Sequence, residues 1–227
     1  MIDWSSIDTV LLDMDGTLLD LHFDNYFWQV HLPKQYAEKH QITEEQSSAL
    51  LHEQVSSNRG TLDWYSLDHW SERLEMDIPA LTREIQHMIS LRPHTIDFLT
   101  QLHISHRDVV MVTNAHRKTL DIKMGQIDIT HWFDRVVVSH DLDSPKEEQA
   151  FWAKLQALHP FDPARTLLID DTEQILQSAR DYGIAHLLTL LQPDSKRQRR
   201  IDTHFPGIHH FDEIMPGITA PAGEQAS

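Results

Sequence analysis

The sequence of 227 residues contains no cysteine. This excludes a disulfide framework and catalysis by a thiolate, and it leads us to expect a cytoplasmic protein. An apolar run of about 18 residues, the length that a transmembrane helix needs, is also missing, so we expect no membrane span. The N-terminal MIDWSSID lacks a basic segment followed by an apolar one, so no secretory signal is expected.

Positive charge is scarce as well. There are 19 Lys and Arg residues against 35 Asp and Glu residues, and the formal net charge at pH 7 is −16. A chain this acidic should repel nucleic-acid backbones and anionic membranes unless one face is strongly basic, so we expect neither of them as its partner. An anionic substrate would need a metal ion or local cations. The one basic cluster, KRQRR at 196–200, is expected to be a solvated loop.

Short apolar runs alternate with helical patterns through most of the chain. Five runs are typical of strands: TVLLD (9–13), DVVMVT (108–113), RVVVS (135–139), TLLID (166–170) and HLLTL (186–190). Helical patterns occupy 93–104, 116–127, 146–159 and 172–183, with Pro93 expected to open the first and Gly183 to close the last. The alternation predicts an α/β fold, a doubly wound parallel sheet that binds ligands at the carboxyl ends of its strands.

One interval breaks this alternation. Residues 20–91 show no convincing strand, yet they carry amphipathic helical patterns and are too many for a structureless loop. We therefore predict a helical domain at 20–91, inserted into a core made of residues 1–19 and 92–215. The tail at 216–227, PGITAPAGEQAS, is expected to be disordered.

The stretch TVLLDMDGTLL places two carboxylates, Asp13 and Asp15, at the end of the first expected strand. Gly16 lets the backbone approach a ligand closely, and exposed N–H groups there can hold an anion. A divalent cation would remove the repulsion between the carboxylates, and Mg²⁺ prefers such oxygen ligands. With Mg²⁺ bound, one carboxylate can attack a phosphoryl group while the other transfers a proton. Incidental acids at a strand end are the alternative, but an Asp-x-Asp-Gly-Thr motif directly after an apolar strand favours function.

Three later strand ends carry polar residues too. Thr113 and Asn114 stand at the end of the second strand, Lys146 comes after the third, and Asp170 and Asp171 stand at the end of the fourth. Each has an ordinary interpretation by itself, as a helix cap, a surface lysine or an N-capping acid. A lysine at the positive end of a helix is normally unfavourable, which suggests a specific role for Lys146. The four motifs together indicate one site.

These motifs, in this order, resemble those of the haloacid dehalogenase (HAD) superfamily of phosphatases, and the resemblance extends from about Ile7 to Leu191. It implies that the inserted helices form the cap domain of that superfamily. The catalytic residues that it implies are the nucleophile Asp13, the general acid and base Asp15, and Thr113 and Lys146. It also implies phosphate binding by Gly16, Thr113, Asn114 and Lys146, and a Mg²⁺ cofactor bound by Asp13, Asp15 and Asp170, with Asp171 as a further ligand or a water-mediated one. The sequence departs from the commonest pattern at Ile169, where the fourth motif has no glycine.

Two stretches of the insert, 19–40 and 58–70, further resemble the GMP/IMP 5′-nucleotidases of that superfamily. This implies a Mg²⁺-dependent phosphomonoesterase that dephosphorylates purine 5′-mononucleotides through an aspartyl phosphate. The insert is dense in aromatic residues, on which a base could stack, although a small cap core also needs such side chains. The candidate specificity residues are Arg59, Trp64, Tyr26 and Asn25, and Asp24 is open to either interpretation.

Other functions fit parts of the pattern. A phosphatase for sugar phosphates or phosphoglycolate, or a phosphomutase, would use the same core and differ in the cap. Removal of halide from haloacids is not expected, because that reaction needs no second carboxylate and Asp15 is present. A signalling receiver domain is not expected, because it carries its paired acids first in the chain and has no such insert. A non-enzymatic binding protein is not expected either, because it would tolerate the loss of Asp13 or Asp15 and both are present.

Overall fold

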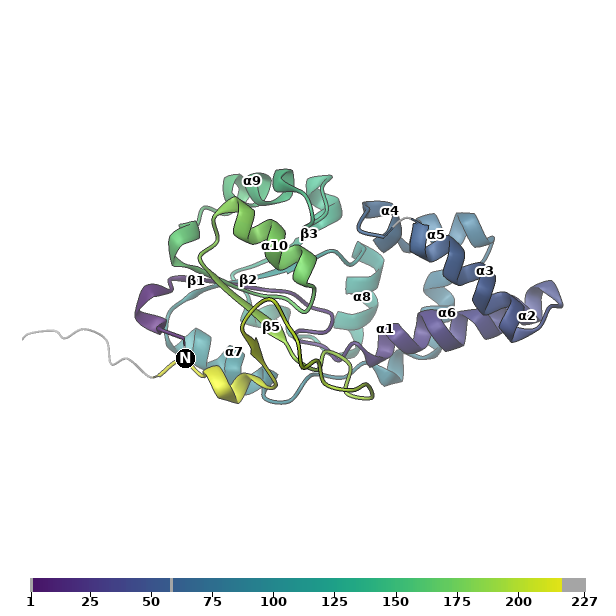
Figure 1. Ribbon diagram of the computed structural model, residues 1–227, viewed down its shortest axis with the longest axis horizontal. Coiled ribbons are helices and arrows are strands. Elements are labelled where there is room, and N and C mark those ends of the chain that lie inside the picture. Colours follow the sequence, from purple (N-terminus) through teal and green to yellow (C-terminus); the bar gives the residue numbers. More distant parts are fainter. Residues whose placement is uncertain (1, 58, 218–227) are drawn as a thin grey trace, which may run out of the picture.

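The computed structural model of the chain describes residues 2–57 and 59–217 (Figure 1). Its sheet is entirely parallel, with the strand order β3-β2-β1-β4-β5-β6. The strands are β1 (Thr9–Leu12), β2 (Asp108–Thr113), β3 (Arg135–Val138), β4 (Thr166–Ile169), β5 (His186–Leu190) and β6 (Gly207–Ile208). The prediction of a doubly wound parallel sheet is confirmed. The five expected strands are present, whereas β6 was not predicted because two residues are too few to form a pattern.

The helices of the core also follow the predicted pattern. They are α7 (Thr95–Ile104), α8 (Arg117–Gln126), α9 (Gln149–Leu158) and α10 (Glu173–Tyr182), and short 3₁₀ turns are η1 (Trp4–Ser6), η4 (Thr130–Trp132), η5 (Ser139–Leu142), η6 (Pro163–Arg165) and η7 (Phe211–Ile214). Gly183 ends α10 in the left-handed region, with φ 110°, as expected. Pro93 does not open a helix, because α7 begins only after His94, whose φ is 63°. Likewise α9 begins at Gln149, so Lys146 lies in the turn before it.

Strand alternation divides the core between the two faces of the sheet. On one face, Leu11 and Val110 pack in a cluster with Phe151 and Trp152 of α9 and with residues of α10. On the other face, the neighbouring positions Val10, Leu12, Val109 and Met111 join a cluster that includes side chains of α7 and α8. Helices therefore cover both faces, and the carboxyl ends of the strands are left for the site.

The helices between β1 and α7 form a group to one side of the sheet, on the right in Figure 1. An isolated antiparallel bridge between Leu19 and Leu91 joins the two chain segments that connect this group, here called the cap, to the core. Its elements are α1 (His22–Tyr26), the π-helical η2 (Phe27–His31), α2 (Leu32–His40), α3 (Glu44–Ser57), α4 (Leu62–Tyr65), α5 (Leu67–Leu74), α6 (Ile78–Glu84) and the 3₁₀ turn η3 (Gln86–Met88).

The aromatic residues of the cap mostly form its own core. Trp70 and Phe27 are buried, and Trp28 packs edge-on against Trp70 with 5.7 Å between ring centroids. Hydroxyl groups cap two of the helices, since Thr61 accepts from the N–H of Trp64 and Ser66 accepts from that of His69. No helix of the described residues has the length and apolar character to cross a membrane. Residues 218–227 of the predicted tail lie outside the described residues.

Candidate active site

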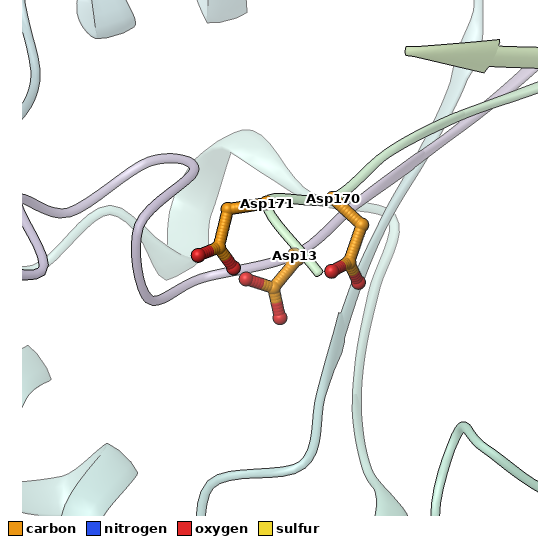
Figure 2. Close-up of side chains that lie close together, drawn as sticks. All are labelled: Asp13, Asp170 and Asp171. Atoms are coloured by element: carbon orange, nitrogen blue, oxygen red, sulfur yellow. The ribbon is translucent and has the colours of Figure 1, made fainter. Parts of the chain in front are cut away.

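Two neighbouring strands bring the first and fourth motifs together. Strands β1 and β4 pair with Leu12 opposite Ile169, so the next residues, Asp13 and Asp170, leave the sheet side by side. Asp171 follows, and each of these three residues offers a carboxylate oxygen within 4.8 Å of the others (Figure 2). All three side chains are buried. The structure thus gathers an acidic cluster at the carboxyl edge of the sheet, where the sequence predicted the site.

Lys146 is the buried cation of this cluster. Its Nζ lies 2.6 Å from Asp13 Oδ1 and 2.7 Å from Asp170 Oδ2, and it also donates to the carbonyl oxygen of Val112. The side chain is 1 % exposed. The Lys146 N–H donates to Oδ1 of Asn114, which fixes the turn that carries it. The ammonium group therefore bridges the two carboxylates from a fixed position.

Burial and charge compete in this cluster. Burial raises the pKa of Asp13 above its usual range, and repulsion from Asp170 and Asp171 adds to this, while Lys146 acts in the opposite direction. Burial and the charge of Asp170 raise the pKa of Asp171 to about 7. Burial alone would lower the pKa of Lys146, but Asp13 and Asp170 raise it above its ordinary value. Two cationic groups, Lys146 and Arg200, whose Nη2 lies 3.7 Å from Oδ2 of Asp171, face three carboxyl groups, so the cluster is suited to a further cation.

Gly16 shapes the turn after β1. Its N–H donates to the carbonyl oxygen of Leu19 and is therefore used within the turn, not free for an anion. Glycine is needed because φ is +81° and because a Cβ atom would lie 2.7 Å from Cγ of Asp171. The turn after β1 thus packs directly against the acidic cluster.

Asp15 does not join the three clustered carboxylates. Its Oδ1 accepts a 2.6 Å hydrogen bond from Nζ of Lys123, which also donates to both carboxylate oxygens of Asp24 at 2.7 and 2.9 Å. Lys123 was not identified from the sequence. A signal was available, because Lys123 lies on the buried face of α8 beside Leu120 and Ile122.

The second motif lies beside the cluster. Thr113 is buried, and its hydroxyl oxygen accepts the N–H of Ala115 at 3.0 Å, which leaves the hydroxyl proton for another acceptor. The Asn114 side chain accepts from the N–H of Lys146 and donates to Oε2 of Glu147 at 2.9 Å. Asn114 thus positions the third motif as well as lining the site.

The cap reaches the core through α4. The Tyr65 hydroxyl donates to Oε1 of Glu147 at 2.7 Å, and Nε2 of His140 lies 3.0 Å from the carbonyl oxygen of Leu62. Of the cap residues predicted to read the substrate, Arg59 is exposed and precedes this helix, while Trp64 lies on it, edge-on to Tyr65 with 4.7 Å between ring centroids. This loop and helix, residues 59–65, approach the catalytic motifs.

The other two predicted specificity residues lie on α1. The side chain of Tyr26 is half-buried against the hydrophobic core of the protein. Asn25 donates from Nδ2 to Oδ2 of Asp194 at 2.7 Å, so its amide joins the cap to the loop after β5.

One residue of the basic cluster at 196–200 differs from the prediction of a solvated loop, because Arg200 donates from Nη1 to the carbonyl oxygen of Asp171 and is not simply solvated. Nothing in the sequence pattern indicated that contact.

The fold and the four motifs at one sheet edge define a class of enzyme. A family model described as haloacid dehalogenase-like hydrolase matches residues 10–189, and the chain belongs to that family. It is a hydrolase of the HAD phosphatase type. Among individual proteins, it is 37% identical over 217 residues to the GMP/IMP nucleotidase YrfG of Escherichia coli strain K12, covering 96% of this chain and 98% of that protein. The same identity and coverage hold for a Shigella flexneri protein of that name.

Solved structures share the fold. A HAD phosphatase from Thermococcus onnurineus has a TM-score of 0.76 at 17% identity, covering 91% of this chain and 95% of its own. The HAD-hydrolase YfnB from Bacillus subtilis, solved bound to magnesium, has a TM-score of 0.64 at 17% identity, covering 91% of this chain and 96% of its own. At these identities the likeness concerns the fold alone.

Proposed function

We propose that this protein is a Mg²⁺-dependent phosphomonoesterase that hydrolyses the purine 5′-mononucleotides GMP and IMP through a phosphorylated Asp13. The observation that carries the chemistry is the buried ammonium group of Lys146, which bridges Asp13 and Asp170 at the carboxyl ends of β1 and β4. The choice of substrate is supported by the 37% identity, over 96% of the chain, to a relative named GMP/IMP nucleotidase.

The acidic cluster fits Mg²⁺. Asp13, Asp170 and Asp171 supply oxygen donors that lie within 4.8 Å of one another, the ligand type that this ion prefers. Lys146 offsets only part of their negative charge. These three side chains would hold the ion, which when bound would offset the charge of the phosphate and polarise its oxygens.

The residues of the site can divide the reaction into two displacements. In the first, a carboxylate oxygen of Asp13 attacks phosphorus in line, the bond from phosphorus to the ribose 5′ oxygen breaks, and Asp15 gives that oxygen a proton. In the second, Asp15 takes a proton from water as the water oxygen attacks phosphorus. The bond to Asp13 then breaks, and inorganic phosphate leaves. Thr113 and Asn114 donate to the phosphoryl oxygens throughout, while the charge of Lys146 steadies the Asp13 nucleophile and the phosphoryl group beside it.

A substrate panel tests this proposal. Phosphate release with Mg²⁺ should be at least about tenfold faster for GMP and IMP than for CMP, UMP or glucose 6-phosphate, a ratio that cap contacts can supply. If phosphoglycolate or a hexose phosphate is instead the best substrate by a similar margin, the nucleotidase proposal is wrong and the sugar-phosphate alternative holds.

The Asp13→Asn variant serves as the matched control for the panel. It keeps the shape of the side chain and removes the attacking charge, so release should fall to background for every substrate while the melting curve stays cooperative. Undiminished phosphate release from folded Asp13→Asn protein would contradict the covalent mechanism whichever substrate is preferred.

A further inference from the structure

Lys123 is a buried lysine that belongs to none of the four motifs. It lies on α8, and its side chain is 1 % exposed. Lysine is almost never fully buried unless it is paired. Burial alone would lower the pKa of Lys123, but the charges of Asp15 and Asp24 raise it above the ordinary value, so the ammonium form is retained.

Every donor of this ammonium group is used. Nζ donates to Oδ1 of Asp15 at 2.6 Å and to both oxygens of Asp24 at 2.7 and 2.9 Å, and a lysine ammonium group has three donors. The group also lies 5.3 Å from the ring centroid of Phe23. With its donors occupied and its surface covered, Lys123 is placed to act on Asp15 and not on a substrate.

The partners of Lys123 come from two different parts of the molecule. Asp15 belongs to the turn after β1, two residues beyond Asp13, whereas Asp24 lies on α1, the first helix of the cap. The side chain of Asp15 is 21 % exposed, so it is not enclosed by the pair with Lys123. Lys123 therefore joins the cap to a carboxyl group that remains open to the site.

We propose that Lys123 is a positioning residue that fixes the carboxyl group of Asp15 for proton transfer and ties it to the cap through Asp24. This inference rests on the proposed function, in which Asp15 is the general acid. Proton transfer needs donor and acceptor within hydrogen-bond reach, and small misplacements of such groups reduce the rate steeply. Without the ammonium group, Asp15 and Asp24 would repel each other, and the Asp15 side chain would lose its fixed orientation.

The experiment compares two leaving groups. Values of kcat/KM report the steps up to release of the leaving group, so they isolate the first displacement. An alkyl phosphate, taken as the best nucleotide or sugar phosphate of the wild-type panel, needs a proton on its departing oxygen. p-Nitrophenyl phosphate has a good leaving group and needs that proton far less. If Asp15 loses its position, kcat/KM for the alkyl phosphate should therefore fall more than kcat/KM for p-nitrophenyl phosphate.

The variants are Lys123→Met, which removes the cation at similar length, and Lys123→Arg, which retains it. For Lys123→Met we expect kcat/KM to fall at least about tenfold more for the alkyl phosphate than for the aryl phosphate, part of the general-acid contribution. Lys123→Arg should recover most of the difference. Lys39→Met is the matched control, because Lys39 is a cap lysine that donates to the backbone oxygens of Leu74 and Glu75, and it should leave both substrates unchanged.

If Lys123→Met does not fold, the double variant Lys123→Met, Asp24→Asn replaces it, since this variant removes one charge of each sign. The same leaving-group dependence is then expected. Equal losses for both phosphates in folded protein, or no loss for either, would overturn the positioning role while the proposed function stands. Failure of the wild-type enzyme to hydrolyse any alkyl phosphate would contradict the proposed function and this inference together.

Discussion

The hydroxyl group of Tyr65 donates a 2.7 Å hydrogen bond to Oε1 of Glu147, which joins the cap to the residue next to Lys146. Glu147 in turn accepts from Nδ2 of Asn114 on the second motif. Burial, followed by the nearby charge of Glu147, raises the pKa of Tyr65, so the phenol remains a donor at any physiological pH. The contact connects cap position to two catalytic loops.

Tyr65→Phe should weaken closure of the cap. A hydrogen bond to a charged group contributes about 1.5–3 kcal/mol, so kcat/KM for the best nucleotide should fall by about tenfold or more, and the melting temperature should fall by several degrees. Steady-state kinetics and a melting curve measure both. Tyr36→Phe is the control, since Tyr36 also lies in the cap but stacks on His40, at 4.1 Å between ring centroids. Equal effects of the two substitutions would show that closure does not depend on the Glu147 contact.

Gly16→Ala should disturb the acidic cluster. The new Cβ atom would lie 2.7 Å from Cγ of Asp171, and the residue would also keep a φ of +81°, a strained conformation that costs about 1 kcal/mol or more. Gly183→Ala is a matched control, because its φ is +110° and no atom lies within 4 Å of the added carbon. Both variants should lose unfolding free energy in urea titrations, but only Gly16→Ala should need more Mg²⁺ for half-maximal activity. An unchanged Mg²⁺ requirement in Gly16→Ala would separate the turn from the metal site.

Mg²⁺ should stabilise the folded protein by an amount that grows with the logarithm of its concentration above the dissociation constant. Binding to the folded state alone adds about 2.7 kcal/mol at 100 times the dissociation constant, because ligand binding is linked to folding. Asp170→Asn should reduce this gain and raise the Mg²⁺ requirement, whereas Asp181→Asn, on the exposed side of α10, should leave both unchanged. Differential scanning fluorimetry over a Mg²⁺ series measures the effect. Full activity in excess chelator would contradict the metal assignment.

The sequence predicted the core because its strands are buried on both faces and read as apolar runs. It placed Asp13, Thr113, Lys146 and Asp170 correctly at one edge, since parallel strands all end there. It could not show that Asp15 faces Lys123, because a contact between residues 108 positions apart depends on how α8 packs.

The cap was the harder part to predict. Most of its aromatic residues serve as core, and a helical pattern cannot distinguish a ring that packs inward from one that faces a ligand. Asn25 illustrates this limit, because its amide is used by Asp194, 169 positions away. The basic cluster shows the same limit, since Arg200 reaches the backbone of Asp171 across a loop.

A histidine pair at the contact between cap and core predicts a pH dependence of stability. His116 and His140 meet edge-on with 5.0 Å between ring centroids. Nε2 of His140 donates to the carbonyl oxygen of Leu62, and Nδ1 of each ring is buried with no partner among the described residues. Burial lowers the pKa of both histidines below the ordinary value of 6.5, and the neighbouring ring adds to this for His116.

The direction of this pH dependence follows from how many protons the folded and the unfolded states bind. Below about pH 6.5 these two histidines bind protons in the unfolded chain but not in the folded protein. The free energy of unfolding therefore falls as the pH falls, by up to about 1.4 kcal/mol per pH unit for each histidine. The loss ends once the pH passes the folded pKa. Urea titrations at fixed Mg²⁺ measure this free energy of unfolding. Between about pH 7.5 and about pH 5.5 it should fall less for the double variant His116→Gln, His140→Gln than for wild type. An identical fall in wild type and in the double variant would exclude these histidines as the source of the pH dependence.

The loop before α4 is placed to discriminate between substrates. Residues 59–61 lead into α4, whose Tyr65 contacts Glu147, so residues 59–65 meet the core next to the turn that carries Lys146. Arg59 is exposed there, and a guanidinium group can donate to the 6-oxo oxygen of guanine or hypoxanthine. Trp64 offers a ring on which a purine could stack, a contact of about 1–3 kcal/mol.

Arg59→Ala should therefore lower kcat/KM for GMP and IMP by about tenfold while leaving p-nitrophenyl phosphate within about twofold, since the aryl substrate has no purine to read. Arg83→Ala, which removes an exposed arginine from α6 of the same cap, is the control for lost positive charge. Trp64→Ala should show the same selectivity, once a melting curve has established that the cap still folds without this partly buried ring. Losses that are equal for nucleotide and aryl phosphate would place base recognition elsewhere than this loop.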